Sequence, residues 1–279
     1  MGQISCEIKS LDKTFHYSRR KDPSPTNIKY MLHNHPYYEI LIFLKGNADF
    51  YVEGSVYPLK PMDILVMRDD EMHKVVNTSQ DTYERIVIYL EKSFFQSEEM
   101  KQYENIFLSK GKGEKNLIER ENVKKAEIFD TLLRIEKYIK QNNQGNEHLI
   151  RCILTEFLHQ LKELGTSVGT TPNQMVKAIM DYINDHYNED LSLDCLAERF
   201  YVSKYHLCRC FKQYAGLTIN HYITCRRLMH VRKLHSQGKT LAVASTEAGF
   251  TSYSNFYKAY VRETGYSPSE GLSGQQKDD

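Results

Sequence analysis

The chain has 279 residues, of which 41% are hydrophobic and 26% are charged. This length predicts two domains, and this composition is typical of a globular protein rather than a disordered or fibrous one. No apolar run approaches the ~20 residues that span a bilayer, and the N-terminal stretch lacks the apolar core of a signal peptide, so we expect no membrane partner. The six cysteines are scattered, which predicts reduced thiols in a cytoplasmic protein.

Short β-rich runs separated by turns fill the region from residue 30 to residue 90. We predict strands at 38–44, 48–52, 55–59, 63–67, 73–76 and 83–90. Turn-forming residues at 45–47 (K-G-N) and 53–55 (E-G-S) indicate hairpins. Residues 1–29 should add one or two edge strands. Several short strands at this spacing predict a small barrel or jelly roll.

The segment 33–46 reads H-x-H-x3-E-x6-G and resembles the first motif of the cupin barrels, and residues 73–77 resemble the end of the second. The resemblance implies a cupin-like barrel. In metal-dependent cupins the matching side chains bind Mn, Fe, Ni or Zn, which suit imidazole and carboxylate ligands. These residues are His33, His35, Glu39 and His73. The second motif departs from the family at 61–63 (P-M-D), where a glycine is usual. The alternative is that no cofactor binds and these groups contact an organic ligand or one another.

The mouth of such a barrel commonly holds one small molecule among apolar walls with a few placed polar groups. We therefore expect a small polar effector, such as a sugar. The candidate ligand-binding residues are His33, His35, Tyr38, Glu39 and His73. The face that each strand residue takes stays open, because a shift of one residue in register turns every side chain to the other face.

From Lys92 onward the apolar residues recur with a helical period. We predict helices at 93–107, 122–142 and 147–164, with a flexible loop at 111–113. Their apolar stripes need a partner surface, which is either the barrel alone or the barrel and a second copy of the chain. Residues 1–164 would thus form a sensing and dimerisation domain, and residues 165–172 a linker.

The region from Leu191 to Pro268 contains one pattern twice, about 49 residues apart: Ser203 superimposes on Ser252, and Gly216 on Gly265. Each half predicts a helix-turn-helix, in which Ser192, Ser203, Thr240 and Ser252 cap the helices. A helix at 173–186 precedes the first unit, and a long helix at 218–236 joins the two. Tyr201 stands in the first turn, where a glycine is common because positive φ is easy for it.

The net charge of +1 conceals a strongly basic segment. Residues 199–262 contain eleven Lys or Arg and a single acid, Glu247. Such an excess is what the neutralisation of nucleic-acid phosphates requires, whereas a merely solvated basic face normally carries interspersed acids. The segment therefore predicts double-stranded DNA as a partner.

Recognition helices must present side chains that reach base edges and phosphates. The candidates in the first unit are Lys204, Tyr205, Cys208, Arg209 and Lys212. Those in the second unit are Tyr253, Ser254, Asn255, Tyr257 and Lys258. Arg209 should read guanine and Lys212 should meet phosphate. On the connecting helix we expect Arg226, Arg227, Arg232 and Lys233 to face outward.

Residues 193–268 resemble the DNA-binding domain of AraC/XylS-type transcription regulators. The resemblance rests on L-x-x-L-A-x-x-F-x-V-S-x-x-x-L-x-x-x-F-K at 193–212, R-R-L at 226–228, A-G-F-x-S-x-S-x-F-Y-K at 248–258 and T-G-Y-S-P at 264–268. The family usually continues S-P-x-x-Y-R, whereas this chain continues S-P-S-E-G-L. We expect the DNA-binding domain to occupy 173–270, Pro268 to end its folded part, and 271–279 to be a disordered tail.

The resemblance implies a multidomain α+β protein, with an N-terminal cupin-like barrel and a C-terminal all-α domain. Its function would be ligand-responsive, sequence-specific transcription regulation by a homodimer that reads two successive major-groove segments. If the protein activates transcription, it would also contact RNA polymerase. We do not expect it to be an enzyme. Two alternatives remain: a metal-dependent cupin enzyme with a DNA-binding appendage, and a regulator whose first domain docks a protein partner.

Overall fold

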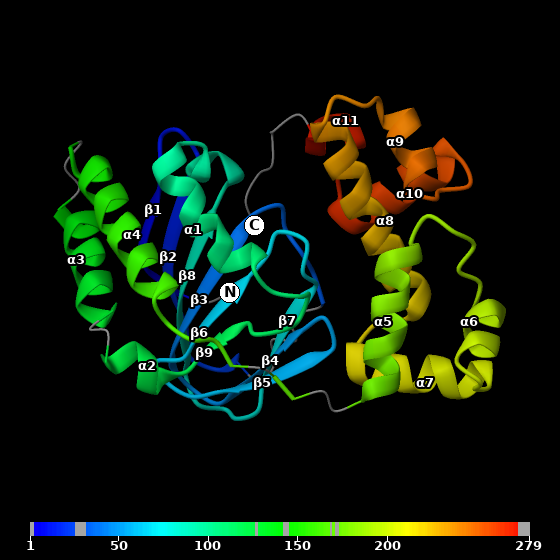
Figure 1. The fold of residues 1–279 in the computed structure, drawn as a ribbon, viewed down its shortest axis with the longest axis horizontal. Coiled ribbons are helices and arrows are strands. Elements are labelled where there is room, and N and C mark those ends of the chain that lie inside the picture. Colours follow the sequence, from blue (N-terminus) through cyan, green and yellow to red (C-terminus); the bar gives the residue numbers. More distant parts are fainter. Residues whose placement is uncertain are drawn as a thin grey trace. The chain divides into compact units, whose positions relative to one another are not determined.

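The computed structural model describes residues 3–25, 32–125, 128–141, 145–167, 169–170 and 173–272. The chain divides into two compact units, and the boundary between them falls between Pro172 and Asn173. Each unit is described by itself (Figure 1). Among the described helices, none has the length and apolar character that crossing a membrane would require.

The first unit is built on two β-sheets, as the cupin resemblance implies. The strands of its described residues are β1 (Gln3–Lys9), β2 (Phe15–Asp22), β3 (Tyr38–Lys45), β4 (Ala48–Val52), β5 (Ser55–Leu59), β6 (Ile64–Met67), β7 (His73–Asn77), β8 (Tyr83–Leu90) and β9 (Leu117–Ile118). The larger sheet has the order β1-β2-β8-β3-β6-β9, and the smaller has the order β5-β4-β7. The prediction of an edge strand before residue 30 is confirmed by β1, whereas β2 lies inside the sheet between β1 and β8.

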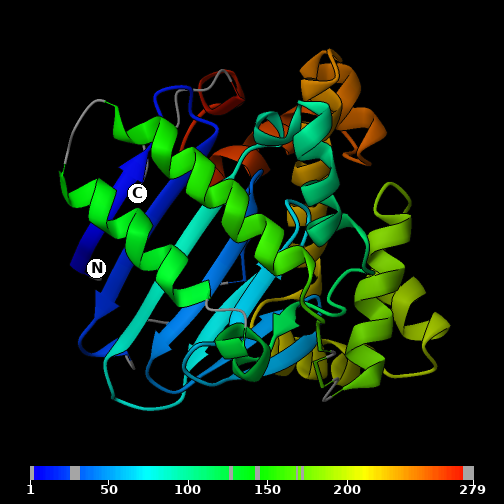
Figure 2. The same ribbon diagram turned by 60° about the vertical axis from the view of Figure 1, so that its left-hand side comes forward.

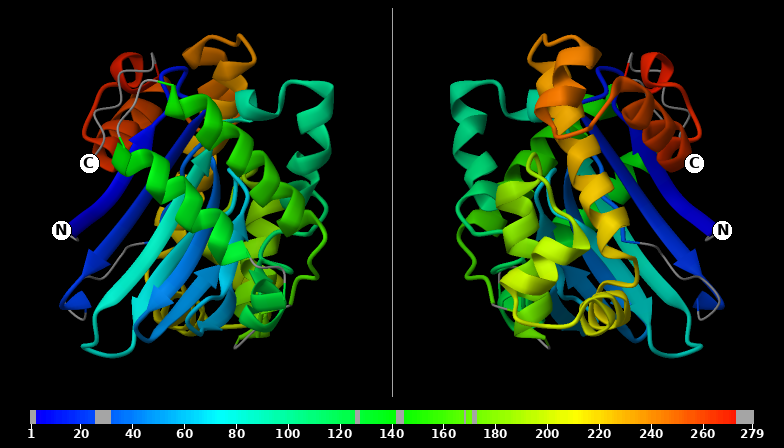
Figure 3. Two further views of the ribbon diagram at one scale, coloured as in Figure 1. Left: turned by 90° about the vertical axis from the view of Figure 1, so that its left-hand side faces the viewer. Right: turned by 90° about the vertical axis from the view of Figure 1, so that its right-hand side faces the viewer.

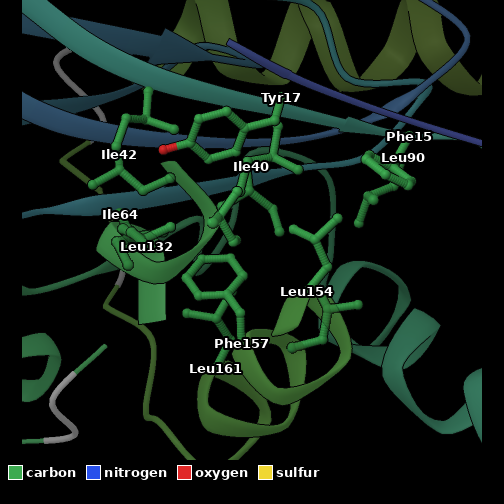
Figure 4. Packing of buried hydrophobic residues seen from close by; sticks show 14 of the residues in the cluster. Phe15, Tyr17, Ile40, Ile42, Ile64, Leu90, Leu132, Leu154, Phe157 and Leu161 are labelled. Carbon is green, nitrogen blue, oxygen red and sulfur yellow. The ribbon is translucent and has the colours of Figure 1, made fainter. Parts of the chain in front are cut away.

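The larger sheet is covered on both faces. Its inner face shares a core with the smaller sheet, in which Leu41 and Phe43 of β3 pack with Phe50 and Val52 of β4. Its outer face packs under the helices α3 (Ile128–Gln141) and α4 (Asn146–Lys162), which lie across the strands in Figure 2. In this outer core the aromatic ring of Phe157 points toward the side chains of the sheet (Figure 4).

The predicted helix at 93–107 is in fact two elements. A 3-10 helix, η2 (Lys92–Phe95), is followed by α1 (Glu98–Leu108), because Ser97 takes an extended conformation and begins α1 as its N-cap residue. The predicted helix at 122–142 is represented by α2 (Arg120–Lys125) and α3, and residues 126–127 lie outside the described residues.

The segment 111–113 is anchored to the barrel rather than being a flexible loop. The Gly113 amide donates to Glu71 Oε1 at 2.7 Å, and Asn116 Nδ2 donates to Glu71 Oε2 at 2.9 Å. A Cβ atom at Gly113, whose φ is +70°, would lie 2.7 Å from the Val52 carbonyl oxygen. The buried Glu71 carboxylate therefore organises a turn that the sequence indicates only as glycine-rich.

Part of the predicted linker pairs with the first unit. The Ser167 amide donates to the Leu117 carbonyl at 2.6 Å, while Thr170 and Val56 exchange two backbone hydrogen bonds of 2.8 and 3.0 Å. These described residues therefore extend the barrel by backbone pairing, which a polar sequence does not reveal.

The second unit consists of helices in its described residues. They are α5 (Gln174–His186), α6 (Leu193–Arg199), α7 (Lys204–Ala215), α8 (Ile219–Ser236), α9 (Leu241–Glu247), α10 (Tyr253–Thr264) and α11 (Pro268–Leu272). The pairs α6–α7 and α9–α10 form the two helix-turn-helix units, and α8 runs between them (Figure 3). All four predicted caps are present: each hydroxyl oxygen accepts a hydrogen bond from the backbone amide three residues on.

The turns of the two helix-turn-helix units differ in whether they can accept a residue larger than glycine. Tyr201 has a φ of +53° and its side chain is 95% exposed, so the left-handed conformation is its only cost. Gly249 has a φ of +87°, and a Cβ atom there would lie 2.7 Å from Asn188 Cα. The second turn therefore requires glycine for contact as well as for conformation.

The prediction that Pro268 ends the folded part is wrong. Pro268 is the first residue of α11, a position where its missing amide costs nothing. Ser267 and Glu270 form a capping box, since the Ser267 amide donates to Glu270 Oε2 and the Glu270 amide donates to Ser267 Oγ. Residues 271 and 272, expected in the tail, belong to this helix, and 273–279 lie outside the described residues.

Gly249→Ala should destabilise the second unit by about 1–3 kcal/mol, since it adds a clash with Asn188 to the cost of positive φ. Chemical denaturation of the full chain measures this loss. Gly238→Ala is the matched control, because Gly238 has a φ of +92° and, among the described residues, no atom lies within 4 Å of the place that a Cβ would take. Equal losses in the two variants would contradict a contact with Asn188.

Candidate functional site

A cavity of about 180 Å³ lies inside the barrel of the first unit. Its walls combine apolar with titratable side chains. The lining residues are Arg20, His33, Glu39, Leu41, Phe50, His73, Val75, Tyr83, Arg85, Val87 and Tyr89. Such a mixture is typical of a small-molecule site.

At one wall of the cavity lies a cluster of three histidines and Glu39, of which His33, His73 and Glu39 line the cavity and His35 lies behind them. His35 Nε2 lies 2.6 Å from Glu39 Oε2, and His73 Nε2 lies 3.3 Å from the same oxygen. His33 and His73 exchange two backbone hydrogen bonds, and their rings are 4.6 Å apart. The structure thus brings together four of the five candidate ligand-binding residues.

Both ring nitrogens of His73 face oxygen acceptors, because Nδ1 lies 2.9 Å from the Glu71 carbonyl and Nε2 faces Glu39. Burial by itself disfavours the imidazolium, but the bond to Glu39 and its charge outweigh burial and raise the pKa of His73. Burial would likewise raise the pKa of Glu39, yet the hydrogen bonds from His35 and His73 hold that pKa below its usual range. Each of the two groups therefore favours the charged form of the other.

The same side chains offer the donors of a metal site. One nitrogen of each of His33, His35 and His73 lies within 4.8 Å of the others, whereas Glu39 does not belong to this group. Three imidazoles fit Zn²⁺ or a similar ion in donor type. A metal on His73 Nε2 would have to replace any proton on this nitrogen, which lies 3.3 Å from Glu39 Oε2. The cluster can therefore hold either a proton or a metal at that point.

Tyr38 does not belong to this site, and the expectation that it contacts the ligand is wrong. Its hydroxyl donates to Glu104 Oε1 at 2.7 Å, and its ring stacks on Phe107 at 4.6 Å in the outer core. The cause is strand alternation: Tyr38 and Glu39 are neighbours on β3, so their side chains point to opposite faces of the sheet.

Two arginines in the cavity were not identified from the sequence. Arg20 of β2 and Arg85 of β8 are directly opposed in the strand register. Arg85 lies 3.3 Å from Asp22 Oδ2, while the buried Nε of Arg20 has no hydrogen-bond partner among the described residues. Like charges opposite each other on neighbouring strands are unfavourable unless an anion compensates them. Only the pairing of β2 with β8 brings these two arginines together, and a single sequence does not show which strands pair.

The second candidate site is the exposed face of α7. Tyr205 is 74% exposed, and the Arg209 guanidinium lies over its ring at 5.6 Å. Lys204 pairs with Asp194 on the surface, and Lys212 is exposed. Cys208, between them, is half-buried. The structure thus places all five predicted residues of the first unit outside the buried stripe of Leu207 and Phe211.

The corresponding face of α10 is less charged. Its five candidate residues are all exposed, namely Tyr253, Ser254, Asn255, Tyr257 and Lys258. The Asn255 side chain donates to Thr251 Oγ1 at 2.7 Å, so it is already engaged at the start of the helix. Phe256 and Tyr260 form the buried stripe beneath them.

The prediction that Arg226 and Arg227 face outward is wrong. Arg226 is 1% exposed, and its Nε and Nη2 donate to the Tyr222 hydroxyl at 3.1 and 2.8 Å. That hydroxyl in turn donates to Asn184. Arg227 is half-buried and donates to the carbonyl oxygens of Tyr187 and Glu189, each at 2.8 Å. Two of the eleven cations therefore stabilise the helical unit internally.

Glu39→Gln should lower the melting temperature in a pH-dependent way. The Glu39 carboxylate stabilises the fold above its ordinary pKa of 4.5, and the His73 imidazolium does so below its ordinary pKa of 6.5 and loses this effect as pH rises through its raised pKa. We expect the largest difference from the parent protein between the two ordinary pKa values, at about pH 5.5, and a smaller one once pH has risen through the raised pKa of His73. Thermal denaturation across pH measures it, with Glu104→Gln as control; a difference independent of pH would contradict the ion pair.

Comparisons with known proteins agree with this arrangement. Residues 15–158 match the family model of the AraC-like ligand binding domain, and residues 196–273 match that of a helix-turn-helix domain. No cofactor is indicated by either family. The uncharacterized HTH-type transcriptional regulator YbfI of Bacillus subtilis is 25% identical over 230 residues, which cover 81% of each chain. The regulatory protein PocR of Salmonella typhimurium is 32% identical over 98 residues, 34% of this chain and 32% of PocR.

An HTH-type regulator of Staphylococcus aureus, SACOL0084, is 23% identical over 235 residues, which cover 81% of this chain but 30% of that protein. Among solved structures, ToxT of Vibrio cholerae is 14% identical, with 94% of this chain and 98% of ToxT covered at a TM-score of 0.39. The family models together cover the barrel and the helices α7 and α10. The chain therefore belongs to the AraC family of transcription regulators, with an AraC-like ligand-binding domain followed by a helix-turn-helix DNA-binding domain.

Proposed function

We propose that this regulator reads two successive major-groove segments of its operator, one with α7 and one with α10. The observation that carries the proposal is that both helices share a serine N-cap, a left-handed glycine C-cap and an exposed polar face above a buried aromatic stripe. Recognition helices of this kind lie in the major groove and reach bases with such a face. The contacts of the first unit would be stronger, because Arg209 can donate two hydrogen bonds to guanine.

Arg209→Ala should weaken operator binding by about 1–3 kcal/mol and relax the preference at one base pair, since the guanidinium would read guanine. Lys212→Ala should weaken binding to all sequences and reduce the salt slope by about 1, since it would neutralise phosphate. Binding titrations at several salt concentrations, after selection of the operator from a random DNA pool, measure both. Lys101→Ala, on α1, is the charge-matched control. Unchanged sequence preference in Arg209→Ala would contradict base reading by this residue.

We further propose that a small polar effector binds in the barrel cavity and shifts the populations of the regulator's conformational states. A sugar fits the size and the mixed walls of the cavity. The opposed Arg20 and Arg85 favour an effector that also carries an acidic group, because guanidinium forks pair with carboxylates in two hydrogen bonds. Sugar acids combine both properties.

Sugar acids should raise the melting temperature of the full chain more than the corresponding neutral sugars, since a ligand that binds the native state stabilises it. Thermal shift against paired neutral and acidic sugars tests this. Arg20→Gln should abolish the preference for the acids, whereas Arg134→Gln, at an exposed ion pair on α3, should retain it. Equal shifts with neutral and acidic partners would contradict a role of Arg20 in charge recognition.

A homodimer is proposed to form through α3 and α4, on which Leu133 and Leu149 remain 46% and 42% exposed. Sedimentation velocity tests this assembly.

RNA polymerase is proposed as a further partner if the protein activates transcription. We propose no catalytic role: the alternative of a metal-dependent enzyme depends on His33, His35 and His73, and a purified protein without bound transition metal would remove its support.

A further inference from the structure

The second unit contains a group of donor side chains that DNA reading does not use. His221 and Cys225 are four residues apart on α8, so they share one face of the helix. Glu263 lies near the end of α10. One ligand atom from each of the three lies within 4.8 Å of the other two, and all three residues are half-buried.

We propose that His221, Cys225 and Glu263 form a binding site for Zn²⁺ or a chemically similar divalent transition metal. Imidazole nitrogen, thiolate sulfur and carboxylate oxygen are the three ligand types of zinc in proteins, and three protein ligands leave the fourth tetrahedral position to water. Half-burial gives the ion a path to the site, which a fully buried core cluster lacks.

The position of the carboxylate supports the site. Glu263 Oε2 faces His221 Nε2 at 2.8 Å, while Oε1 accepts a hydrogen bond from Arg262 Nε at 2.9 Å. Arg262 therefore holds one oxygen as an outer partner and leaves the other directed at the cluster, as partners of metal ligands commonly do. The Arg262 side chain is 66% exposed, so water screens much of its repulsion toward a cation.

Metal binding would join two helices with different roles. α8 follows the first helix-turn-helix unit, and α10 is the recognition helix of the second. A shared ion would bond the first turns of α8 to the last turn of α10 and so hold the second recognition helix at a fixed place relative to α8. The metal site itself does not depend on DNA reading; its effect on operator affinity rests on the proposed function.

Titration of the full chain with Co²⁺, a spectroscopic substitute for Zn²⁺, tests the site. We expect a thiolate-to-cobalt charge-transfer band, which reports a sulfur ligand and is silent for the histidine cluster of the barrel. Cys225→Ser should abolish the band. His221→Gln and Glu263→Gln, which keep the sulfur, should weaken Co²⁺ binding at least tenfold, and Zn²⁺ should displace Co²⁺ from the parent protein.

His206 and Cys210 provide a matched control within the same unit. They too are four residues apart on one helix, with Sγ 3.5 Å from a ring nitrogen, but among the described residues no third donor of the same kinds completes a group with them. Cys210→Ser should therefore retain the full band. Absence of the band in the parent protein, or its persistence in Cys225→Ser, would overturn the proposal.

Operator binding with and without Zn²⁺ separates this inference from the proposed function. We expect Zn²⁺ to change the operator affinity of the parent protein about tenfold. The same addition should leave the operator affinity of Glu263→Gln unchanged. If the parent protein binds operator but shows no thiolate band, the metal site is wrong and the DNA reading stands. If the band is present but no operator is selected, the metal site stands and the proposed function fails.

Discussion

The burial of β3 on both faces determines where its two candidate residues, Tyr38 and Glu39, point. Six consecutive residues of this strand, from Tyr38 to Phe43, are buried, although alternate side chains enter different cores. Glu39 enters the cavity between the sheets, and Tyr38 enters the outer core, where its ring meets Phe95 of η2 and Phe107 of α1. A carboxylate inside such a strand must be paired, because an isolated buried charge is costly. His35 and His73 supply that pairing, and a register shifted by one residue would turn Glu39 away from both.

The same constraint explains how much could be predicted from the sequence. Turn residues mark the ends of the strands, and β4, β5 and β8 have the predicted bounds. Serine and threonine caps mark the helices of both recognition units in the same way. A strand that is apolar on both faces carries no alternation, so the sequence did not indicate the face that Tyr38 takes. Arg20 and Arg85 meet only through strand pairing between distant segments, which local patterns do not contain.

The burial of cationic side chains is the second feature that the sequence predicts wrongly. A helical position occupied by arginine is normally solvent-exposed, and Arg226 was assigned accordingly. Its burial is possible because the Tyr222 hydroxyl accepts two of its donors, and Tyr222 in turn depends on Asn184 of α5. These hydrogen bonds, from Arg226 through Tyr222 to Asn184, connect α8 with α5. They therefore fix two helices of the same unit that contains α7. Counting charges in the segment thus overstates the surface available to phosphate.

The short helix α11 gives the end of the described chain a structural role. Pro268 is buried, and Leu272 packs against the core formed by Phe256 and Tyr260 of the second recognition unit. Proteolytic trimming back to Ser267 would uncover this aromatic core while leaving the first recognition unit intact. A protease acting near this end would then leave only the first helix-turn-helix unit with its core covered. Expression truncations that remove α11 would produce the same defect without any change in the recognition residues.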